Sequence, residues 1–237
     1  MLGKTDQLPN CTRDGEPGMS NADDGGDDGQ MAHRLVFFSD AVFAIVLTLL
    51  VLELRPPELH SANGLVHALR EMIPHFIAFG ASFGVVSIFW AAHMSIFRPI
   101  KVFDWVTAWV NLLFLLTIAL MPFASAILGR YGTQGESWRI YSVVLIAAAV
   151  AQCLLVLVLY RGKGRLVGGT TGRAVAYRLV RAASPGIVFG LALWLSLIGE
   201  TRLSSLCWVL FPPIMIFARL LFGPRKAQVA PAEAPAT

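Results

Sequence analysis

Charged side chains are scarce in this sequence. Lysine, arginine, aspartate and glutamate make up 14% of its 237 residues, whereas soluble domains contain about 25%. Hydrophobic residues account for 56%, and the mean hydropathy is +0.64. A soluble globule of this length has too little interior to bury so much apolar surface. The composition therefore excludes a typical cytosolic enzyme, a disordered chain and a nucleic-acid-binding module.

Cysteines and catalytic motifs are scarce as well. The three cysteines, Cys11, Cys153 and Cys207, form no CxxC pair, which argues against a disulfide framework and a zinc site. The sequence contains no HExxH, no GxSxG and no P-loop. We therefore expect neither an enzyme nor a bound cofactor or small-molecule substrate. The TVGYG filter of the usual potassium channels is absent too, so any ion path must be lined by helices.

Apolar runs long enough to cross a bilayer are abundant. A helix needs about 20 residues to span about 30 Å of hydrocarbon, and its backbone groups must be satisfied internally. Six segments meet this length: residues 35–54, 70–97, 103–128, 138–160, 174–199 and 203–222. We predict an all-α membrane protein with six transmembrane helices in one domain, residues 34–222. The polar residues 1–33 and the Ala- and Pro-rich residues 223–237 are predicted to be disordered tails.

Basic residues are distributed unevenly around these segments. With the N-terminus in the cytoplasm, 14 of the 19 lysines and arginines fall on the cytoplasmic side and 5 on the other. Membrane proteins carry an excess of positive charge on their cytoplasmic side. The pattern predicts that both termini are cytoplasmic. It also accounts for the net charge of +4 without a polyanionic partner.

The first apolar segment has two different faces. Arg34, Phe38, Ser39 and Asp40 lie at its start. At about 100° per residue, one arc holds an apolar row with a single hydroxyl, and Asp40 points nearly opposite. The row consists of Ala41, Ile45, Thr48, Leu49 and Leu52. Such a row is usually core or lipid-facing surface, and the lining of a pore is the other interpretation.

Polar side chains also interrupt the second and third segments. Trp90 and His93 lie near the end of the second segment, and Asn111 lies within the third. In the predicted topology they share the cytoplasmic half of the membrane with Ser39 and Asp40. Ser39, Asp40, His93 and Asn111 could form one buried hydrogen-bond network that fixes three helices. Alternatively, Asp40 and His93 could act as a proton relay.

Glycine pairs and prolines mark expected helix contacts and breaks. Gly80 with Gly84, and Gly186 with Gly190, are GxxxG pairs that predict close helix packing. Pro122 predicts a kink or a break in the third segment.

The start of the first segment also carries a family signature. Arg34-x-x-x-Phe38-Ser39-Asp40, followed by an apolar helix, resembles the motif of the transmembrane protein 175 family. Residues 89–93 (FWAAH) and 111–116 (NLLFLL) match the family pattern too. The resemblance covers roughly residues 32–222, although Ala41 stands where members often carry glycine. The family consists of potassium channels of endolysosomes and bacteria, and its fold is a six-helix repeat. Bacterial members have one repeat and form tetramers.

The resemblance implies a homotetrameric potassium channel in the lipid of the bacterial inner membrane, with potassium as the permeant ion and no other metal. The first helix of each of four subunits would line the pore. Ile45 would form the tightest hydrophobic ring, with Leu49 and Leu52 further outward. Thr48 matches the family position implicated in selectivity. The remaining positions would form a structural network: Arg34, Phe38, Ser39, Asp40, Trp90, His93 and Asn111.

Two alternative functions belong to other classes. The first is a proton-coupled secondary transporter that uses Asp40 and His93. The second is a membrane scaffold that conducts nothing. A channel passes potassium passively, a transporter shows saturable flux driven by a pH gradient, and a scaffold shows no flux.

Overall fold

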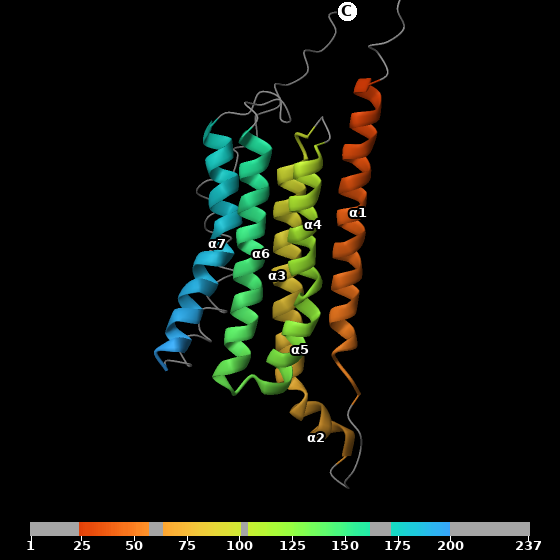
Figure 1. The fold of residues 1–237 in the computed structure, drawn as a ribbon. Helices are drawn as coiled ribbons and strands as arrows, with labels where there is room; N and C mark the ends of the chain where they lie inside the picture. The colour runs from red at the N-terminus through yellow and green to blue at the C-terminus, as the bar shows by residue number, and fades with distance from the viewer. Residues whose placement is uncertain (1–23, 57–63, 101–103, 162–171, 200–237) are drawn as a thin grey trace, which may run out of the picture.

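The computed structural model describes residues 24–56, 64–100, 104–161 and 172–199. In this part of the chain, seven helices form an elongated bundle (Figure 1). They are α1 (Asp24–Leu52), α2 (Gly64–Glu71), α3 (Ile73–Phe97), α4 (Trp105–Ala119), α5 (Met121–Tyr131), α6 (Gly135–Arg161) and α7 (Gly172–Leu197). The all-helical architecture agrees with the prediction.

Five stretches of the described chain are long and apolar enough to cross a membrane. They are Asp28–Leu52, Ile73–Phe97, Trp105–Tyr131, Gly135–Arg161 and Val175–Leu197. These stretches correspond to the first five predicted segments. The sixth predicted segment, residues 203–222, lies outside the described residues, as do residues 1–23 and the predicted tail 223–237.

Two helix boundaries differ from the prediction. α1 begins at Asp24, so residues 24–33 are helical, whereas the sequence predicted a disordered tail up to residue 33. Aspartates in the first turns favour this earlier start, because negative charge stabilises the N-terminal end of a helix. The second predicted segment is divided, since α2 ends at Glu71 and α3 begins at Ile73 with Pro74 in its first turn. Proline suits the first turn of a new helix because its missing N–H is not needed there.

Pro122 breaks the third predicted segment, as expected from the sequence. α4 ends at Ala119, and α5 begins at Met121 after the single residue Leu120. Pro122 lies in the first turn of α5 and is buried. The two helices continue in nearly the same direction (Figure 1) and together make one candidate span.

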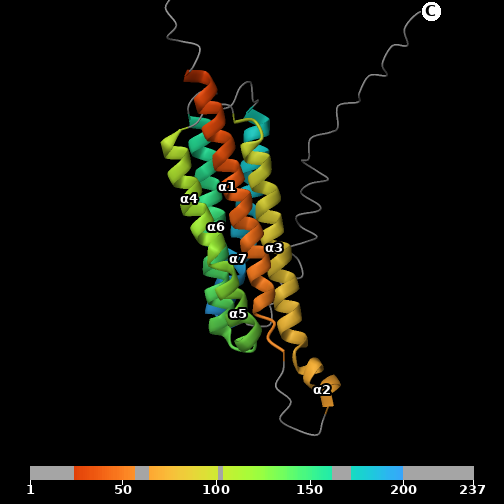
Figure 2. The ribbon, with the colours of Figure 1, turned by 90° about the vertical axis from the view of Figure 1, so that its right-hand side faces the viewer.

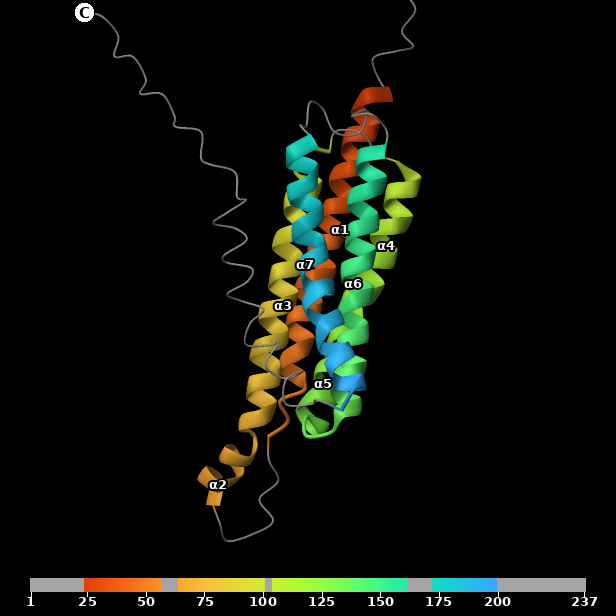
Figure 3. The ribbon, with the colours of Figure 1, turned by 90° about the vertical axis from the view of Figure 1, so that its left-hand side faces the viewer.

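The helix α1 lies at one edge of the bundle. It packs against α3, α4 and α5, while α6 and α7 pack against each other on the far side (Figure 1). Figure 2 shows α1 in front of the other helices, and Figure 3, from the opposite side, shows α7 in front. α1 therefore contacts the rest of the described chain through one side only.

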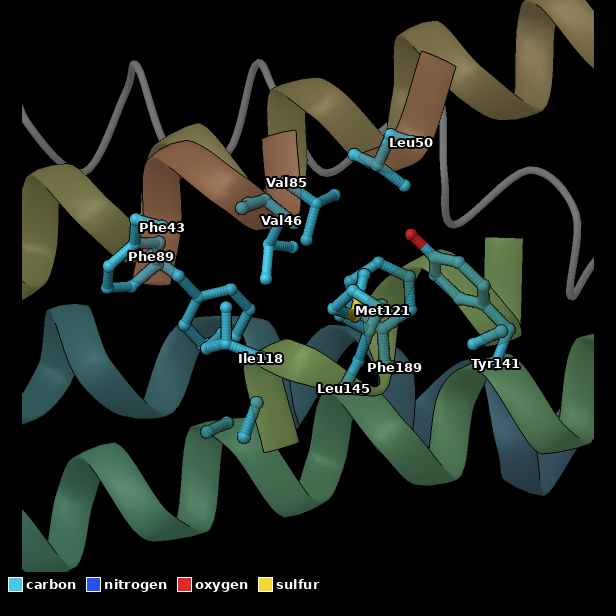
Figure 4. Close-up of a cluster of buried hydrophobic side chains, with 14 of the residues drawn as sticks. Phe43, Val46, Leu50, Val85, Phe89, Ile118, Met121, Tyr141, Leu145 and Phe189 are labelled. Carbon is cyan, nitrogen blue, oxygen red and sulfur yellow. The ribbon is translucent and has the colours of Figure 1, made fainter. Parts of the chain in front are cut away.

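One hydrophobic core is shared by six helices, α1, α3, α4, α5, α6 and α7 (Figure 4). Aromatic and aliphatic side chains from all of these helices meet there. They include Phe43, Val46, Leu50, Val85, Phe89, Ile118, Met121, Tyr141, Leu145 and Phe189. The Tyr141 hydroxyl lies 3.1 Å from Ser82 Oγ and donates a hydrogen bond to it, so this buried phenol is satisfied.

One of the four glycines in the GxxxG pairs makes a close helix contact. A Cβ atom added at Gly186 of α7 would lie 3.0 Å from the Ala149 Cβ atom of α6. A Cβ atom added at Gly80, Gly84 or Gly190 would meet nothing within 4 Å. The predicted close packing is therefore present at Gly186 and absent at the other three within the described chain.

Replacing Gly186 by leucine is expected to separate α6 and α7. Overpacking of a tight contact costs about 1–3 kcal/mol, so the variant should unfold at a lower temperature in detergent than the wild type. Gly190→Leu is the matched control, since it gains the same helix propensity where there is room. Equal melting temperatures for the two variants would contradict the tight α6–α7 contact.

Candidate functional site

Two sides of α1 differ sharply in burial. Ser39, Phe43, Val46 and Leu50 are buried in the bundle. The predicted row lies on another side, and all five of its members are exposed: Ala41, Ile45, Thr48, Leu49 and Leu52. Ile45 exposes 57% of its surface, Leu49 41% and Leu52 66%. Lipid or another copy of the chain must cover such a continuous apolar face.

Thr48 supplies the only hydroxyl in this row. Its Oγ1 atom donates a hydrogen bond to the Ile45 carbonyl oxygen at 2.7 Å. The donated proton points back toward the helix, and the lone pairs of the hydroxyl oxygen remain available. The exposed row thus offers one oxygen ligand per chain among apolar side chains.

A buried hydrogen-bond chain links α1, α3 and α4. His93 Nε2 lies 2.8 Å from Asn111 Oδ1, and Asn111 Nδ2 donates to Ser39 Oγ at 2.9 Å. Ser39 Oγ in turn donates to the Leu35 carbonyl oxygen at 2.8 Å. Because the amide oxygen of Asn111 can only accept, the contact requires a proton on Nε2 of His93. The structure thus joins three of the predicted network residues, all of which are fully buried.

Asp40 belongs to a separate contact. Its Oδ1 atom accepts a hydrogen bond from Trp90 Nε1 at 2.9 Å. No hydrogen bond joins Asp40 to His93 among the described residues. The single network predicted from the sequence is therefore two contacts. Trp90 of α3 bonds Asp40 of α1 directly, whereas His93 of α3 reaches α1 only through Asn111 of α4. The proposed relay from Asp40 to His93 has no direct link.

Three phenylalanines surround the His93 ring. The ring centroid of His93 lies 4.4 Å from that of Phe97, 5.6 Å from that of Phe114 and 5.7 Å from that of Phe43. The Phe114 ring is nearly parallel to the imidazole, at 10°. The sequence analysis missed these residues. Each stands three or four positions after a network residue, on the same side of its helix, and this spacing could have revealed them.

The described residues offer no obvious metal centre. No group of three or more histidine, cysteine, aspartate or glutamate side chains is close enough to hold a metal ion in this part of the chain. Five of the predicted network residues serve as hydrogen-bonding groups in the structure: Ser39, Asp40, Trp90, His93 and Asn111.

The helices that build this network carry the family match. Residues 34–122, which include α1 from Arg34 onward and all of α3 and α4, match the model of the family described as endosomal/lysosomal potassium channel TMEM175. A potassium channel of Streptomyces collinus is 35% identical over 122 residues, which are 50% of this chain and 59% of that protein. Over these residues the chain is similar to the TMEM175 family. This family consists of ion channels, which confirms the prediction that the chain is not an enzyme.

Two TMEM175 proteins of other organisms are similar to the chain, one in its fold and one in its sequence. The crystal structure of a potassium-selective TMEM175 homolog from Chamaesiphon minutus aligns with a TM-score of 0.69 and 26% identity, over 80% of this chain and 98% of that one. The endosomal/lysosomal proton channel TMEM175 of Gallus gallus is 26% identical over 133 residues, which are 56% of this chain and 26% of that protein. The alignments to these curated relatives span less than two thirds of each relative's length.

Two residues of the TMEM175 signature lie outside the hydrogen-bonded network. Arg34 is exposed, and Phe38 exposes 51% of its surface. Neither makes a hydrogen bond or a ring contact within the described chain. Their predicted bracing role has no contact to support it, because they stand one residue before the half-buried Leu35 and the buried Ser39 and so point about 100° away from them. Phe38 instead lies two turns before Ile45 on the same side of α1.

Proposed function

We propose that the chain is a potassium-selective cation channel that conducts passively, with its pore lined by α1 of four identical subunits. The exposed row of Ile45, Thr48, Leu49 and Leu52 carries this proposal, because the rest of the subunit leaves it uncovered. Four copies around one axis would turn these rows toward each other. The names of the Streptomyces and Chamaesiphon proteins support potassium as the ion.

The exposed row suits a hydrophobic gate. Apolar side chains at a constriction expel water, and an ion cannot cross without its hydration shell. In the proposed tetramer Ile45 forms the narrowest ring, with Leu49 and Leu52 toward the outer mouth. When the ring widens, the Thr48 hydroxyl oxygens replace part of the hydration shell of potassium. Selectivity then depends on how closely four oxygens approach the ion.

The buried contacts would hold the gate-bearing helix in place. Ser39, Asn111 and His93 connect α1 to α4 and α3, and Asp40 connects α1 to Trp90 of α3. In this proposal they set the rotation of α1 and therefore which side faces the axis. The channel domain comprises residues 34–222, both termini are cytoplasmic, and the tetramer lies in the bacterial inner membrane. The N-terminal end of α1 is then the inner end of the pore.

The test of the proposal is ion flux through the purified protein in liposomes. Under bi-ionic conditions, with potassium on one side and sodium on the other, the reversal potential should shift toward the potassium equilibrium potential. Flux should be linear in the driving force and independent of a pH gradient. A folded tetramer without flux would contradict the channel, and a reversal potential near zero would contradict its selectivity.

Asp40→Asn separates the channel from the proton-coupled transporter. The asparagine keeps an oxygen that can accept the hydrogen bond from Trp90 Nε1, so the assembly should persist. A channel should retain its potassium selectivity in this variant, whereas a transporter that cycles a proton through Asp40 should lose coupled transport. Size-exclusion chromatography of the variant is the control for assembly. Loss of flux from an intact tetramer would favour the transporter.

A further inference from the structure

A cavity lies at the end of the bundle opposite the N-terminal end of α1. Its volume is about 340 Å³, and it is lined by the residues that follow α1, the start of α3 and most of α5. The lower end of the bundle in Figure 1, near the label of α5, marks its place. This volume falls within the range of small-molecule sites, about 300–1,000 Å³.

The charged side chains around this cavity favour an anion. Arg55 follows α1, Arg130 lies in the last turn of α5, and both residues line the cavity. Both residues are exposed, and neither forms an ion pair within the described chain. Glu53 is the single carboxylate in the lining. Two arginines against one glutamate leave an unmatched positive charge, and guanidinium groups suit phosphate oxygens because they bind them in pairs.

A buried histidine atom adds a second polar group without a partner. Nδ1 of His75 is buried and forms no hydrogen bond. The His75 ring lines the cavity and packs close to α5, since a Cβ atom added at Gly129 would lie 3.3 Å from His75 Cδ2. A buried polar atom without a hydrogen-bond partner is uncommon in proteins, so this atom is available to bond a ligand. Two residues with hydroxyl groups, Ser125 and Tyr131, belong to the same lining.

The remaining wall of the cavity is apolar. Phe79 of α3 and Phe123 of α5 line it, and Phe123 exposes 61% of its surface on the outside of the helix bundle. A free inorganic anion would gain nothing from these rings. An anionic group that carries a hydrocarbon chain would use both the arginines and the phenylalanines.

We propose that this cavity binds the phosphodiester headgroup of an anionic lipid, with its acyl chain along Phe79 and Phe123. The lining residues Glu53 and Arg55 follow Leu52, the last residue of α1, directly in the sequence. A bound headgroup therefore fixes the end of α1 to α3 and α5. The consequence for conductance rests on the proposed channel function, whereas binding itself does not.

The experiment measures lipid binding by the full-length protein in detergent. Short-chain phosphatidylglycerol is titrated, and the melting temperature reports binding through ligand linkage. Phosphatidylcholine of the same chain length tests whether binding requires a headgroup with net negative charge. Inorganic phosphate tests whether the site also binds phosphate from solution. The wild type should bind phosphatidylglycerol in preference to phosphatidylcholine. The double variant Arg55→Gln/Arg130→Gln should bind at least about tenfold more weakly, because it loses two charge-assisted contacts.

The matched control is Arg98→Gln/Arg161→Gln, which removes two exposed arginines at the other end of the bundle. It should bind phosphatidylglycerol like the wild type. Saturable binding of inorganic phosphate that competes with the lipid would support the phosphate site and identify solution as a second source. Equal weakening in both double variants, or equal affinity for phosphatidylcholine, would overturn the proposal. Absence of potassium flux with this binding pattern intact would count against the channel function alone.

Discussion

Ile45→Asn should raise potassium flux about tenfold. In the proposed pore Ile45 forms the narrowest ring, and four amides at that position would hold water where four isoleucines expel it. Each 1.4 kcal/mol removed from the barrier raises the rate about tenfold. We expect an increase of about tenfold, measured as potassium flux into liposomes at constant protein content. Selectivity over sodium should fall at the same time, because a wet ring no longer strips hydration water.

Val51→Asn is the matched control for this prediction. Val51 exposes 48% of its surface on the same helix, but it lies about 120° away from Ile45. The same substitution there adds an equal polar group outside the row and should leave flux within about twofold of the wild type, a change below about 0.5 kcal/mol. A similar gain in both variants would indicate a general loosening of α1. Unchanged flux in Ile45→Asn would place the gate elsewhere.

Asn111→Ala should destabilise the subunit more than any other polar substitution in α4. The alanine leaves Nε2–H of His93 without its acceptor and removes the donor to Ser39 Oγ. An unsatisfied buried donor costs about 1–3 kcal/mol, and the lost volume adds to this cost. We expect the melting temperature in detergent to fall by about 5–10 °C, since 1 kcal/mol corresponds to about 2–4 °C at this chain length.

Thr117→Ala tests whether the loss of stability in Asn111→Ala comes from the network between helices rather than from the loss of any buried polar group. Thr117 lies on the same helix, is 9% exposed, and donates only to the Phe114 carbonyl oxygen of its own helix at 2.6 Å. Its removal breaks no contact between helices and should lower the melting temperature by less than about 3 °C. An equal fall in melting temperature in the two variants would contradict a special role of Asn111.

The sequence predicted those features that depend on local composition or on membrane depth. The five described spans follow from hydropathy, which each segment carries by itself. Ser39, His93 and Asn111 meet because the topology places them at one depth. The exposed row on α1 follows from the helical period alone, since Ile45 and its partners are separated by three or four residues.

The rotation of each helix about its own axis could not be predicted. Asp40 was expected to join His93, but the side of α3 that faces α1 brings Trp90 to it. The start of α1 was missed because glycine and aspartate are poor helix formers, whereas its aspartates favour the N-terminal end. Phe38 was assigned to the network by its motif, although the helical period places it on the exposed side with Ile45.

The hydrogen bonds at the inner half of α1 fix that end of the helix, so any tilt of α1 would turn around it. Ser39 and Asp40 bond α1 to Asn111 and Trp90, and the next polar anchor along α1 would be the proposed lipid site beyond Leu52. Thirteen residues separate Ser39 from Leu52, a length of about 20 Å at 1.5 Å per residue. A tilt of about 6° around Ser39 would move Leu52 by about 2 Å and Ile45 by about 1 Å. In the proposed channel the outer mouth would therefore open about twice as far as the ring at Ile45, and an anchor beyond Leu52 would act on the helix at the point that moves most.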